Sequence, residues 1–435
     1  MGAVYDIVTI ASGLSLASWF YLVFLRGGFW KTDQRLELAD CPDVPGREWP
    51  SICAIVPARD EADVLSRSLG SLLAQDYPGE FHVYLVDDLS EDRTSEVAGQ
   101  IAEESGSKER LEVIKSEQLP DGWIGKVWAM QQGFLKCRER QPDYILLTDA
   151  DIEHAPNSFR SLVNQAIVEQ ADLVSAMVHL RSDEPWGRML IPAFVYFFMK
   201  LYPFRWVNNP RRHTAAAAGG CILVKRDLLQ KVGSFEPIAG EIIDDCALAQ
   251  LIKHLPDKSA FHRAENLPAS SPGTFAPAGG QTAGAMQLAG TGRDGTFRRV
   301  RLCLCRDLKS LRGYDGLRGI WNMVARTAFV QLRHSVVLLV GTVVAMLVVY
   351  MGPVVGVVAA LMSDGDGATW SGILGGTAWA LMALTYTQIL KWYRVPRVYA
   401  VLLPLTALLY TAMTIDSALR TWRGIGGTWK RRSYS

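Results

Sequence analysis

The chain has 435 residues with a formal net charge of +1, 49% hydrophobic residues and 20% charged residues. A charge so near neutral provides no electrostatic footprint for nucleic acid and argues against a nucleic-acid partner. The length exceeds one ordinary domain, and the high apolar fraction predicts a polar domain joined to membrane segments. Seven scattered cysteines form no Cys/His zinc pattern and are expected to be reduced cytoplasmic thiols.

The first expected element is a membrane anchor within residues 1–30. The stretch "YDIVTIASGLSLASWFYLVFL", residues 5–25, has no charge after Asp6 and is long enough to cross a bilayer as a helix. A cleaved signal peptide is the alternative, but its charged first region and its small-residue cleavage pattern are missing. Arg26 and Lys31 follow, so the positive-inside rule places the next segment in the cytoplasm. Together with the apolar stretches expected within 335–420, this anchor predicts a multi-pass protein of the inner membrane with a cytoplasmic domain.

Residues 45–255 are expected to form an α/β domain around a mostly parallel sheet. Short apolar runs predict strands that alternate with segments of helical period, and the strands are expected at residues 51–58, 81–88, 111–116 and 143–151. Alternation at this spacing implies parallel strands joined by crossover helices. Ligands of such sheets bind past the carboxyl ends of the strands.

Three polar clusters follow strands of this predicted sheet: "PARDE" at 57–61, Asp87-Asp88, and "DAD" at 149–151. Each cluster alone is also what a solvated strand end looks like. Gathered around one crevice, their carboxylates would repel one another unless a cation or a hydrogen-bonding ligand lay among them. An Asp-x-Asp pair supplies oxygen ligands suited to a divalent cation. With Arg59 and Lys126 close by in sequence order, the clusters suggest a metal-bound nucleotide.

Two later segments also carry candidate functions. Residues 188–207 are apolar and aromatic with flanking basic residues, which predicts a helix at the lipid surface; a core helix is the alternative. The stretch "EIIDDCALAQLIK", residues 241–253, opens a helix with Asp244 and Asp245, which are candidates for a base or for ordinary helix capping.

The C-terminal part alternates between linker-like and membrane-like composition. Residues 256–305 are rich in Ala, Gly and Pro and predict a linker, or strand-and-loop structure closing an active site. We expect a membrane-interface segment at 306–334, spans within 335–420 and a basic tail at 421–435. Three spans would export this basic tail, against the positive-inside rule. One span is therefore re-entrant, or the first breaks at Gly352-Pro353 into a hairpin, and the number of spans stays open.

Five motifs carry a resemblance to a known family. "PARDE", "VDDLSEDRT", "GWIGKVWAMQQG", "TDAD" and "IIDDCALA" occur in the order found in family 2 glycosyltransferases with the GT-A fold. The N-terminal anchor, the Gly-Trp-x-Gly-Lys segment and the apolar C-terminal region resemble bacterial hopene-associated glycosyltransferases and the ceramide glucosyltransferase-like branch. The resemblance covers roughly residues 5–250 and 306–430.

The resemblance implies a role for each matching residue. The nucleotide-sugar would be bound by Pro57, Arg59, Glu61, Asp87, Asp88, Lys126 and Asp149. Mg²⁺ or Mn²⁺ would be held by Asp151 with Asp149, and Asp245 would be the general base. Contacts to the acceptor or the diphosphate would come from Gly219, Gly220, Asp244, Arg326, Gln331 and Arg333. Packing is the alternative for the two glycines. For Arg326, Gln331 and Arg333, the alternative is an ordinary basic segment at a membrane interface.

The function implied is an inverting transferase that moves one sugar from a nucleotide-sugar to a membrane lipid hydroxyl, with a hopanoid or sphingolipid-like acceptor. A metal would stabilise the leaving diphosphate and a carboxylate would accept the hydroxyl proton. One base suffices, unlike the carboxylate pair of a glycosidase. A processive polysaccharide synthase is the first alternative, although a clean Gln-x-x-Arg-Trp motif is absent. A non-catalytic membrane scaffold is the second, and the oligomeric state is left open.

Overall fold

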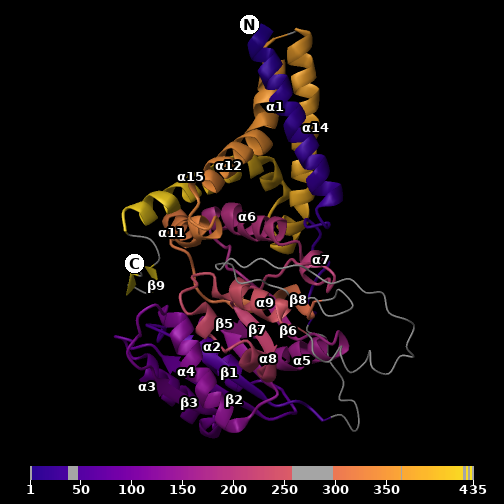
Figure 1. The fold of residues 1–435 in the computed structure, drawn as a ribbon. Coiled ribbons are helices and arrows are strands. Elements are labelled where there is room, and N and C mark those ends of the chain that lie inside the picture. The colour runs from indigo at the N-terminus through magenta and orange to yellow at the C-terminus, as the bar shows by residue number, and fades with distance from the viewer. Residues whose placement is uncertain are drawn as a thin grey trace, which may run out of the picture.

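The computed structural model describes residues 2–37, 48–256, 297–363, 365–424, 428–429 and 432–433. Its lower part is an α/β domain and its upper part a stalk of long helices (Figure 1). Helices α6 (Pro185–Leu201) and α11 (Gly316–Gln331) lie at the junction between the two parts. Most of the Ala/Gly/Pro-rich segment predicted at 256–305, namely 257–296, lies outside the described residues, as do residues 425–427, 430–431 and 434–435 of the basic tail.

One eight-stranded sheet, in the order β3-β2-β1-β4-β7-β6-β8-β5, forms the centre of the domain. Its strands are β1 (Ile52–Ala58), β2 (Phe81–Asp87), β3 (Leu111–Lys115), β4 (Tyr144–Thr148), β5 (Ile152–His154), β6 (Leu173–His179), β7 (Cys221–Lys225) and β8 (Val300–Ser310). Strands β3, β2, β1 and β4 run parallel, as the sequence predicts. Strand β7 is antiparallel to both neighbours, and β5 is antiparallel to β8. The sheet is therefore mixed, with the predicted parallel arrangement confirmed in one half.

Helices cover both faces of the sheet, and β1 shows how the sequence provides for this. Its residues are all buried and alternate between two hydrophobic cores, with Cys53 and Ile55 in one and Ala54 and Val56 in the other. The first core includes α4 (Gly125–Arg140) and α9 (Asp244–His254). The second includes α2 (Leu65–Leu73), α3 (Thr94–Glu104) and α5 (Ser158–Val168). The short helices are α7 (Phe204–Val207) and α8 (Arg226–Lys231).

Helix α4 approaches the sheet closely at Gly133, where a side chain has no room. A Cβ there would lie 2.5 Å from Cγ2 of Ile55 and 3.1 Å from Cγ2 of Val86, both fully buried. We expect Gly133→Ala to destabilise the fold by about 1–3 kcal/mol through overpacking, although alanine favours helix. The measurement is the thermal-unfolding midpoint of the detergent-solubilised chain. Gly99→Ala on α3 is the matched control, since a Cβ there meets nothing within 4 Å and should be neutral or stabilising.

Strand β8 extends the sheet beyond the predicted boundary at residue 255. It lies between β6 and β5, and its residues Leu302 to Cys305 are buried. A strand that lies well beyond α9 in the sequence therefore completes the sheet. This pairing is distant in sequence, which is why a local pattern did not indicate it.

Among the described residues, four helices are long and apolar enough to cross a membrane: Val4–Leu25, Val336–Met362, Asp366–Trp392 and Arg397–Trp422. The first joins α1 (Gly2–Phe20) to a π-helical turn. The second joins α12 (Val336–Met346), a π-helical turn and α13 (Gly352–Met362), so the helix continues through Gly352-Pro353 and forms no hairpin there. The third is α14 (Asp366–Trp392), and the last joins a 3₁₀ turn to α15 (Leu403–Trp422).

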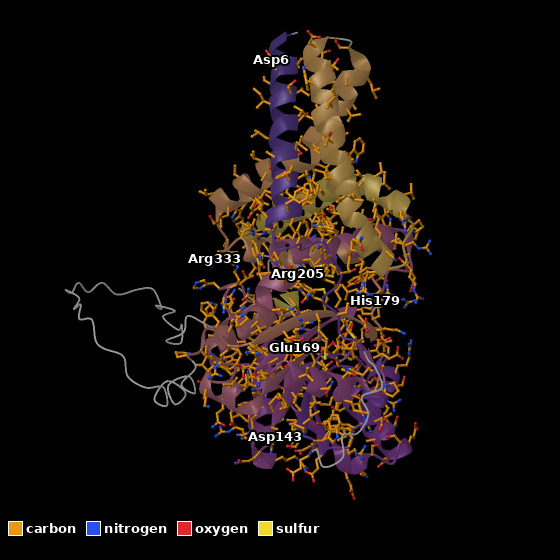
Figure 2. All side chains as sticks on the ribbon, turned by 90° about the vertical axis from the view of Figure 1, so that its right-hand side faces the viewer. Asp6, Asp143, Glu169, His179, Arg205 and Arg333 are labelled. Carbon is orange, nitrogen blue, oxygen red and sulfur yellow. The ribbon has the colours of Figure 1, made fainter. Side chains whose placement is uncertain are left out.

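The arrangement of these helices shows on which side of the stalk the basic tail begins. Helices α1 and α14 stand upright in the stalk, whereas α12 and α15 run obliquely at its base (Figure 1). The N-terminus lies at the far tip of the stalk, and the C-terminal end lies near the α/β domain. Figure 2 gives the same levels in side view, with Asp6 near the tip and Asp143 at the opposite end of the domain. An oblique α15 keeps the start of the basic tail on the side of the domain.

Candidate active site

A cavity of about 920 Å³ lies between the sheet and the helices at the base of the stalk. The sheet contributes the ends of β1, β4 and β6 and the turn after β8. Helices α6 and α12 contribute mainly apolar side chains, whereas α11 and α15 contribute both apolar and polar ones. Most predicted site residues line this one cavity: Pro57, Glu61, Lys126, Asp149, Asp151, Gly219, Gly220, Asp244, Asp245, Arg326 and Gln331.

Lys126 is the central cation of a carboxylate cluster. It stands in the first turn of α4, and its Nζ lies 2.8 Å from Oδ1 of Asp149 and 3.6 Å from Oδ2 of Asp244. Burial disfavours the ammonium, but Asp149 and Asp244 outweigh that effect and raise the pKa of Lys126 above its ordinary value. The cavity therefore presents a permanent cation beside several carboxylates.

Asp245 is fixed in the first turn of α9 by two backbone hydrogen bonds. The Gly219 N–H donates to its Oδ2 and the Cys246 N–H to its Oδ1, each over 2.7 Å. Burial and the adjacent Asp244 raise the pKa of Asp245 to about 7, although Lys126 and the two N–H groups oppose the shift. A carboxylate with this pKa can accept a proton near neutral pH, and its remaining lone pairs are free to do so.

Asp149 and Asp151 follow β4, where the sequence predicts a metal. Ser310 Oγ donates to Oδ2 of Asp151 over 2.7 Å and orients that carboxylate. Within the described residues no group of three or more His, Cys, Asp or Glu side chains is arranged to hold a metal. Two carboxylates suit Mg²⁺ or Mn²⁺ when the substrate's own phosphates supply further oxygens. The donor set thus fits a metal that arrives with a diphosphate.

Glu61 has a partner that the sequence did not single out. Arg312, in the turn after β8, places Nη2 2.6 Å from both carboxylate oxygens of Glu61. Both residues line the cavity. Arg312 was missed because it follows β8, whose place in the sheet depends on contacts distant in sequence. The alternating apolar stretch "VRLCLC", residues 300–305, was the available signal for a strand before it.

Four predicted site residues do not line the cavity. Arg59 donates through Nη1 to the backbone oxygen of Asp88, at 2.6 Å, and pairs with its carboxylate at 3.4 Å. Asp87 accepts hydrogen bonds from the Ser90 N–H and the Ser95 hydroxyl. Arg333 lies in the turn after α11 with φ +52°. Their roles in binding remain predictions, and the contacts seen are those of residues that hold loops in place.

The two predicted glycines differ in what surrounds them. A Cβ on Gly219 would lie 3.3 Å from Oδ2 of Asp245 and 3.4 Å from Nζ of Lys126, inside the charged part of the cavity. A Cβ on Gly220 would lie 2.9 Å from Cγ2 of Val178 on β6. Close packing therefore explains Gly220, whereas Gly219 keeps space open beside the candidate base.

Helix α6 has features of both structures predicted for residues 188–207, a core helix and a helix with an apolar exposed face. Leu190, Ile191 and Tyr196 are fully buried, as in a core helix. Other side chains of α6, including those of Phe194 and Phe197, line the cavity. The helix therefore forms an apolar wall between the carboxylate cluster and the stalk, rather than lying open on a lipid surface along its length.

The sequence of this chain is similar in part to those of known proteins. Residues 53–233 match the family "Glycosyl transferase family 2". An N-acetylglucosaminyltransferase of Mesorhizobium japonicum is 34% identical over 113 residues, which are 26% of this chain and 24% of that protein. A beta-monoglucosyldiacylglycerol synthase of Synechocystis is 30% identical over 125 residues, 28% of this chain and 24% of that protein. The chain thus spans about a quarter of the length of the curated relatives it matches.

Among solved structures, a mannosyltransferase from Pyrobaculum calidifontis, in complex with GDP-Man and Mn²⁺, is similar over 98% of this chain and 100% of that chain. Its identity is 16% and its TM-score 0.49. The sequence match covers β1 to β4 and reaches past α8, so it includes the strand ends that carry Glu61, Asp149 and Asp151. Residues 53–233 thus match the sequence model of glycosyl transferase family 2, a family of enzymes, and they lie in a domain whose mixed α/β sheet is of the predicted GT-A-like type.

Proposed function

We propose that this chain transfers a sugar from a nucleotide-sugar donor to a hydroxyl group of a membrane lipid, on the cytoplasmic face of the inner membrane. The observation that carries the proposal is the continuity of the 920 Å³ cavity. Its charged end holds Lys126 and four aspartates, and its apolar end is formed by α6, α11, α12 and α15. A charged donor and an apolar acceptor would meet where these two surfaces join.

The charged end suits a nucleoside diphosphate leaving group. Lys126 supplies a fixed positive charge, and Arg326 adds another on the α11 side. Asp149 and Asp151 would hold Mg²⁺ or Mn²⁺, which supplies Lewis-acid stabilisation of the diphosphate when it is bound. Asp151 is kept in place for that role by Ser310.

Asp245 is the proposed general base. The acceptor hydroxyl would give its proton to an Asp245 oxygen as its own oxygen attacks the anomeric carbon. The bond between that carbon and the diphosphate oxygen breaks in the same displacement, which inverts the anomeric configuration. The hydrogen bonds from Gly219 and Cys246 hold the carboxylate in one orientation, so little rearrangement is needed when the proton moves.

The lipid nature of the acceptor rests on the apolar end of the cavity and on the four candidate spans. Local similarity to a beta-monoglucosyldiacylglycerol synthase agrees with a glycolipid product. A hopanoid or sphingolipid-like alcohol is a narrower proposal, which depends on the sequence resemblance alone.

The test is donor turnover by the purified full-length chain in detergent with bacterial lipid extract. A panel of UDP- and GDP-sugars is offered with Mg²⁺ or Mn²⁺, and in parallel with chelator. We expect labelled sugar to enter the lipid phase only when the metal is present. Label in a polymer would support a processive synthase instead. Absence of donor consumption with every pair would count against an enzyme of this substrate class.

Activity is also expected to depend on pH through Asp245. Its pKa of about 7 means that the carboxylate, the form that accepts a proton, is lost as pH falls through 7. We expect kcat/KM to fall about tenfold per pH unit below that point and to level off above it. Initial rates between pH 5.5 and 8.5 measure this limb. A profile that is flat across pH 7 would argue against Asp245 as the base.

A further inference from the structure

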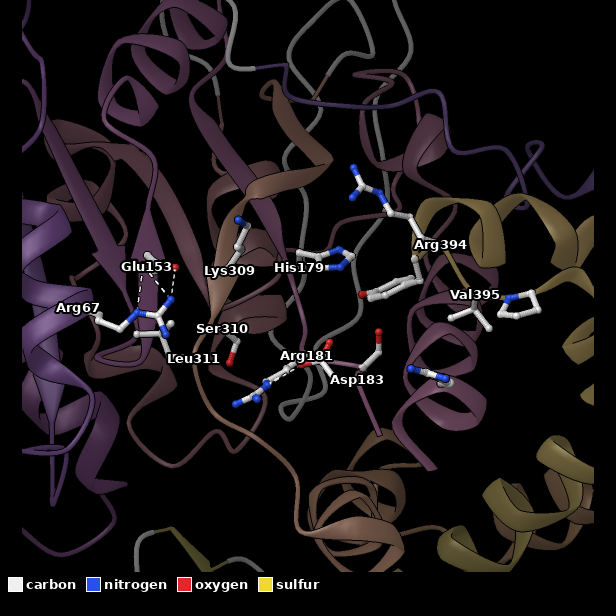
Figure 3. Close-up of a pocket in the computed structure, with 14 residues that line it drawn as sticks. Arg67, Glu153, His179, Arg181, Asp183, Lys309, Ser310, Leu311, Arg394 and Val395 are labelled. Atoms are coloured by element: carbon white, nitrogen blue, oxygen red, sulfur yellow. Dashed lines mark hydrogen bonds and ion pairs between the residues drawn. The ribbon is translucent and has the colours of Figure 1, made fainter. Parts of the chain in front are cut away.

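A second cavity, of about 720 Å³, opens at the junction of the domain and the stalk. Its walls come from α2, β5, the β6–α6 connection, the start of α6, the end of β8 and the turn that follows α14 (Figure 3). The proposed transfer uses none of its charged residues. Ser310 is the one residue that it shares with the larger cavity.

The wall of this second cavity carries more positive charge than negative. Five basic side chains line it: Arg67, Arg181, Arg188, Lys309 and Arg394. The two carboxylates, Glu153 and Asp183, are already engaged, because Arg67 holds Glu153 at 2.9 Å and Arg181 holds Asp183 at 2.8 Å.

Three cations of this wall therefore lack a counter-ion among the described residues. Arg188, Lys309 and Arg394 make no ion pair with any part of the chain that the structure describes. Like charges around one cavity repel, so an anion between them would be stabilised. Lys309 and Arg394 approach from different elements, β8 and the turn after α14, with His179 between them (Figure 3).

His179 adds a neutral hydrogen-bonding group to the same wall. Its ring stacks on Tyr393 with 4.4 Å between centroids, and its buried Nδ1 has no partner among the described residues. Burial, together with Arg306, Lys309 and Arg394, lowers the pKa of His179 to about 4. The ring is thus neutral at pH 7 and can donate one hydrogen bond to an anionic oxygen.

The position of the cavity indicates the source of an anion. Arg394 is two residues past Trp392, where candidate span α14 ends. His179 lies at the level where stalk and domain meet (Figure 2). A helix that crosses the hydrocarbon core ends near the headgroups, where the phosphates of anionic lipids lie.

We propose that this cavity binds a phosphate group, and that the group belongs to the headgroup of an anionic membrane lipid. Arginine and lysine are the usual partners of phosphate oxygens, and charge-assisted hydrogen bonds are the stronger ones. The lipid would join β8 to the end of α14 and so fix the domain against the stalk. This proposal stands independently of the transfer reaction.

The experiment follows thermal unfolding of the full chain in non-ionic detergent while phosphatidylglycerol or phosphatidylcholine is added at equal mole fractions. We expect phosphatidylglycerol alone to raise the midpoint of the wild type, since a ligand that binds the folded state stabilises it. In Lys309→Gln/Arg394→Gln the lipid concentration for half the effect should rise about tenfold or more, from the lost charge-assisted contacts.

Lys391→Gln is the matched control for this experiment. Lys391 is exposed in the last turn of α14, three residues before Arg394, and does not line the cavity. It removes one charge near the same membrane surface and should respond as the wild type does. An unchanged response of the double variant, or equal effects of the two lipids on the wild type, would overturn the proposal.

Single variants and inorganic phosphate extend the same experiment. If the double variant does not fold, Lys309→Gln and Arg188→Gln are titrated singly, and each should weaken the response. Inorganic phosphate is compared with chloride at equal ionic strength. A stabilisation by phosphate that Lys309→Gln removes, with none from the lipid, would assign the site to free phosphate.

Discussion

Asp245→Asn is expected to lower kcat for sugar transfer by about 10²–10⁴-fold, the usual contribution of a positioned general base. Asparagine has nearly the same shape but cannot accept the acceptor's proton. It can also keep only one of the two backbone hydrogen bonds that Asp245 accepts, from Gly219 and Cys246, so a stability loss of about 1 kcal/mol should accompany the change. Transfer of labelled sugar and the thermal-unfolding midpoint are measured on the same preparation.

Asp227→Asn is the matched control. Asp227 also stands in the first turn of a helix, α8, but is absent from the cavity wall. This variant should transfer sugar at the wild-type rate. If Asp245→Asn kept more than about a tenth of the wild-type kcat, the carboxylate would not be the base, and its role would be confined to starting α9.

The charged end of the 920 Å³ cavity was predictable from the sequence because adjacent parallel strands end together. Strands β1 and β4 are neighbours, with Ile52 opposite Tyr144, so the polar residues that follow them share one edge of the sheet. This brings Glu61, Asp149 and Asp151 to one cavity. Asp87 and Asp88 do not line this cavity, because β2 lies one strand further out in the sheet. The polar end of β2 makes local loop contacts instead.

The missing part of the prediction depends on contacts that are distant in sequence. β8 pairs with β6 and β5 after an intervening stretch of more than a hundred residues from each, so no local period indicated its place in the sheet. Arg312 and Ser310 come with β8, and their partners Glu61 and Asp151 lie far earlier in the chain. The long apolar helices, by contrast, were predictable because length and apolar composition are local properties.

Lys126→Met is expected to lower transfer at pH 7 by about 10²–10³-fold, comparable with removal of one preorganised electrostatic contact in other enzymes. The change leaves Asp149 and Asp244 without the cation that lies 2.8 and 3.6 Å away. Lys126 also holds the pKa of Asp245 below the value that burial and Asp244 alone would give. Its removal should therefore raise that pKa further and shift the acidic limb of the rate profile to higher pH.

This shift distinguishes an electrostatic role of Lys126 from a steric one. The pH profile of kcat/KM is compared for the wild type, Lys126→Met and Lys126→Arg, with the unfolding midpoint as a check of the fold. Arginine keeps the charge, so its limb should stay near that of the wild type even if the rate is lower, whereas the methionine variant should regain part of its activity as pH rises. A methionine variant with the wild-type limb would mean that Lys126 does not set the protonation of Asp245, and the base would then be controlled by burial and Asp244 alone.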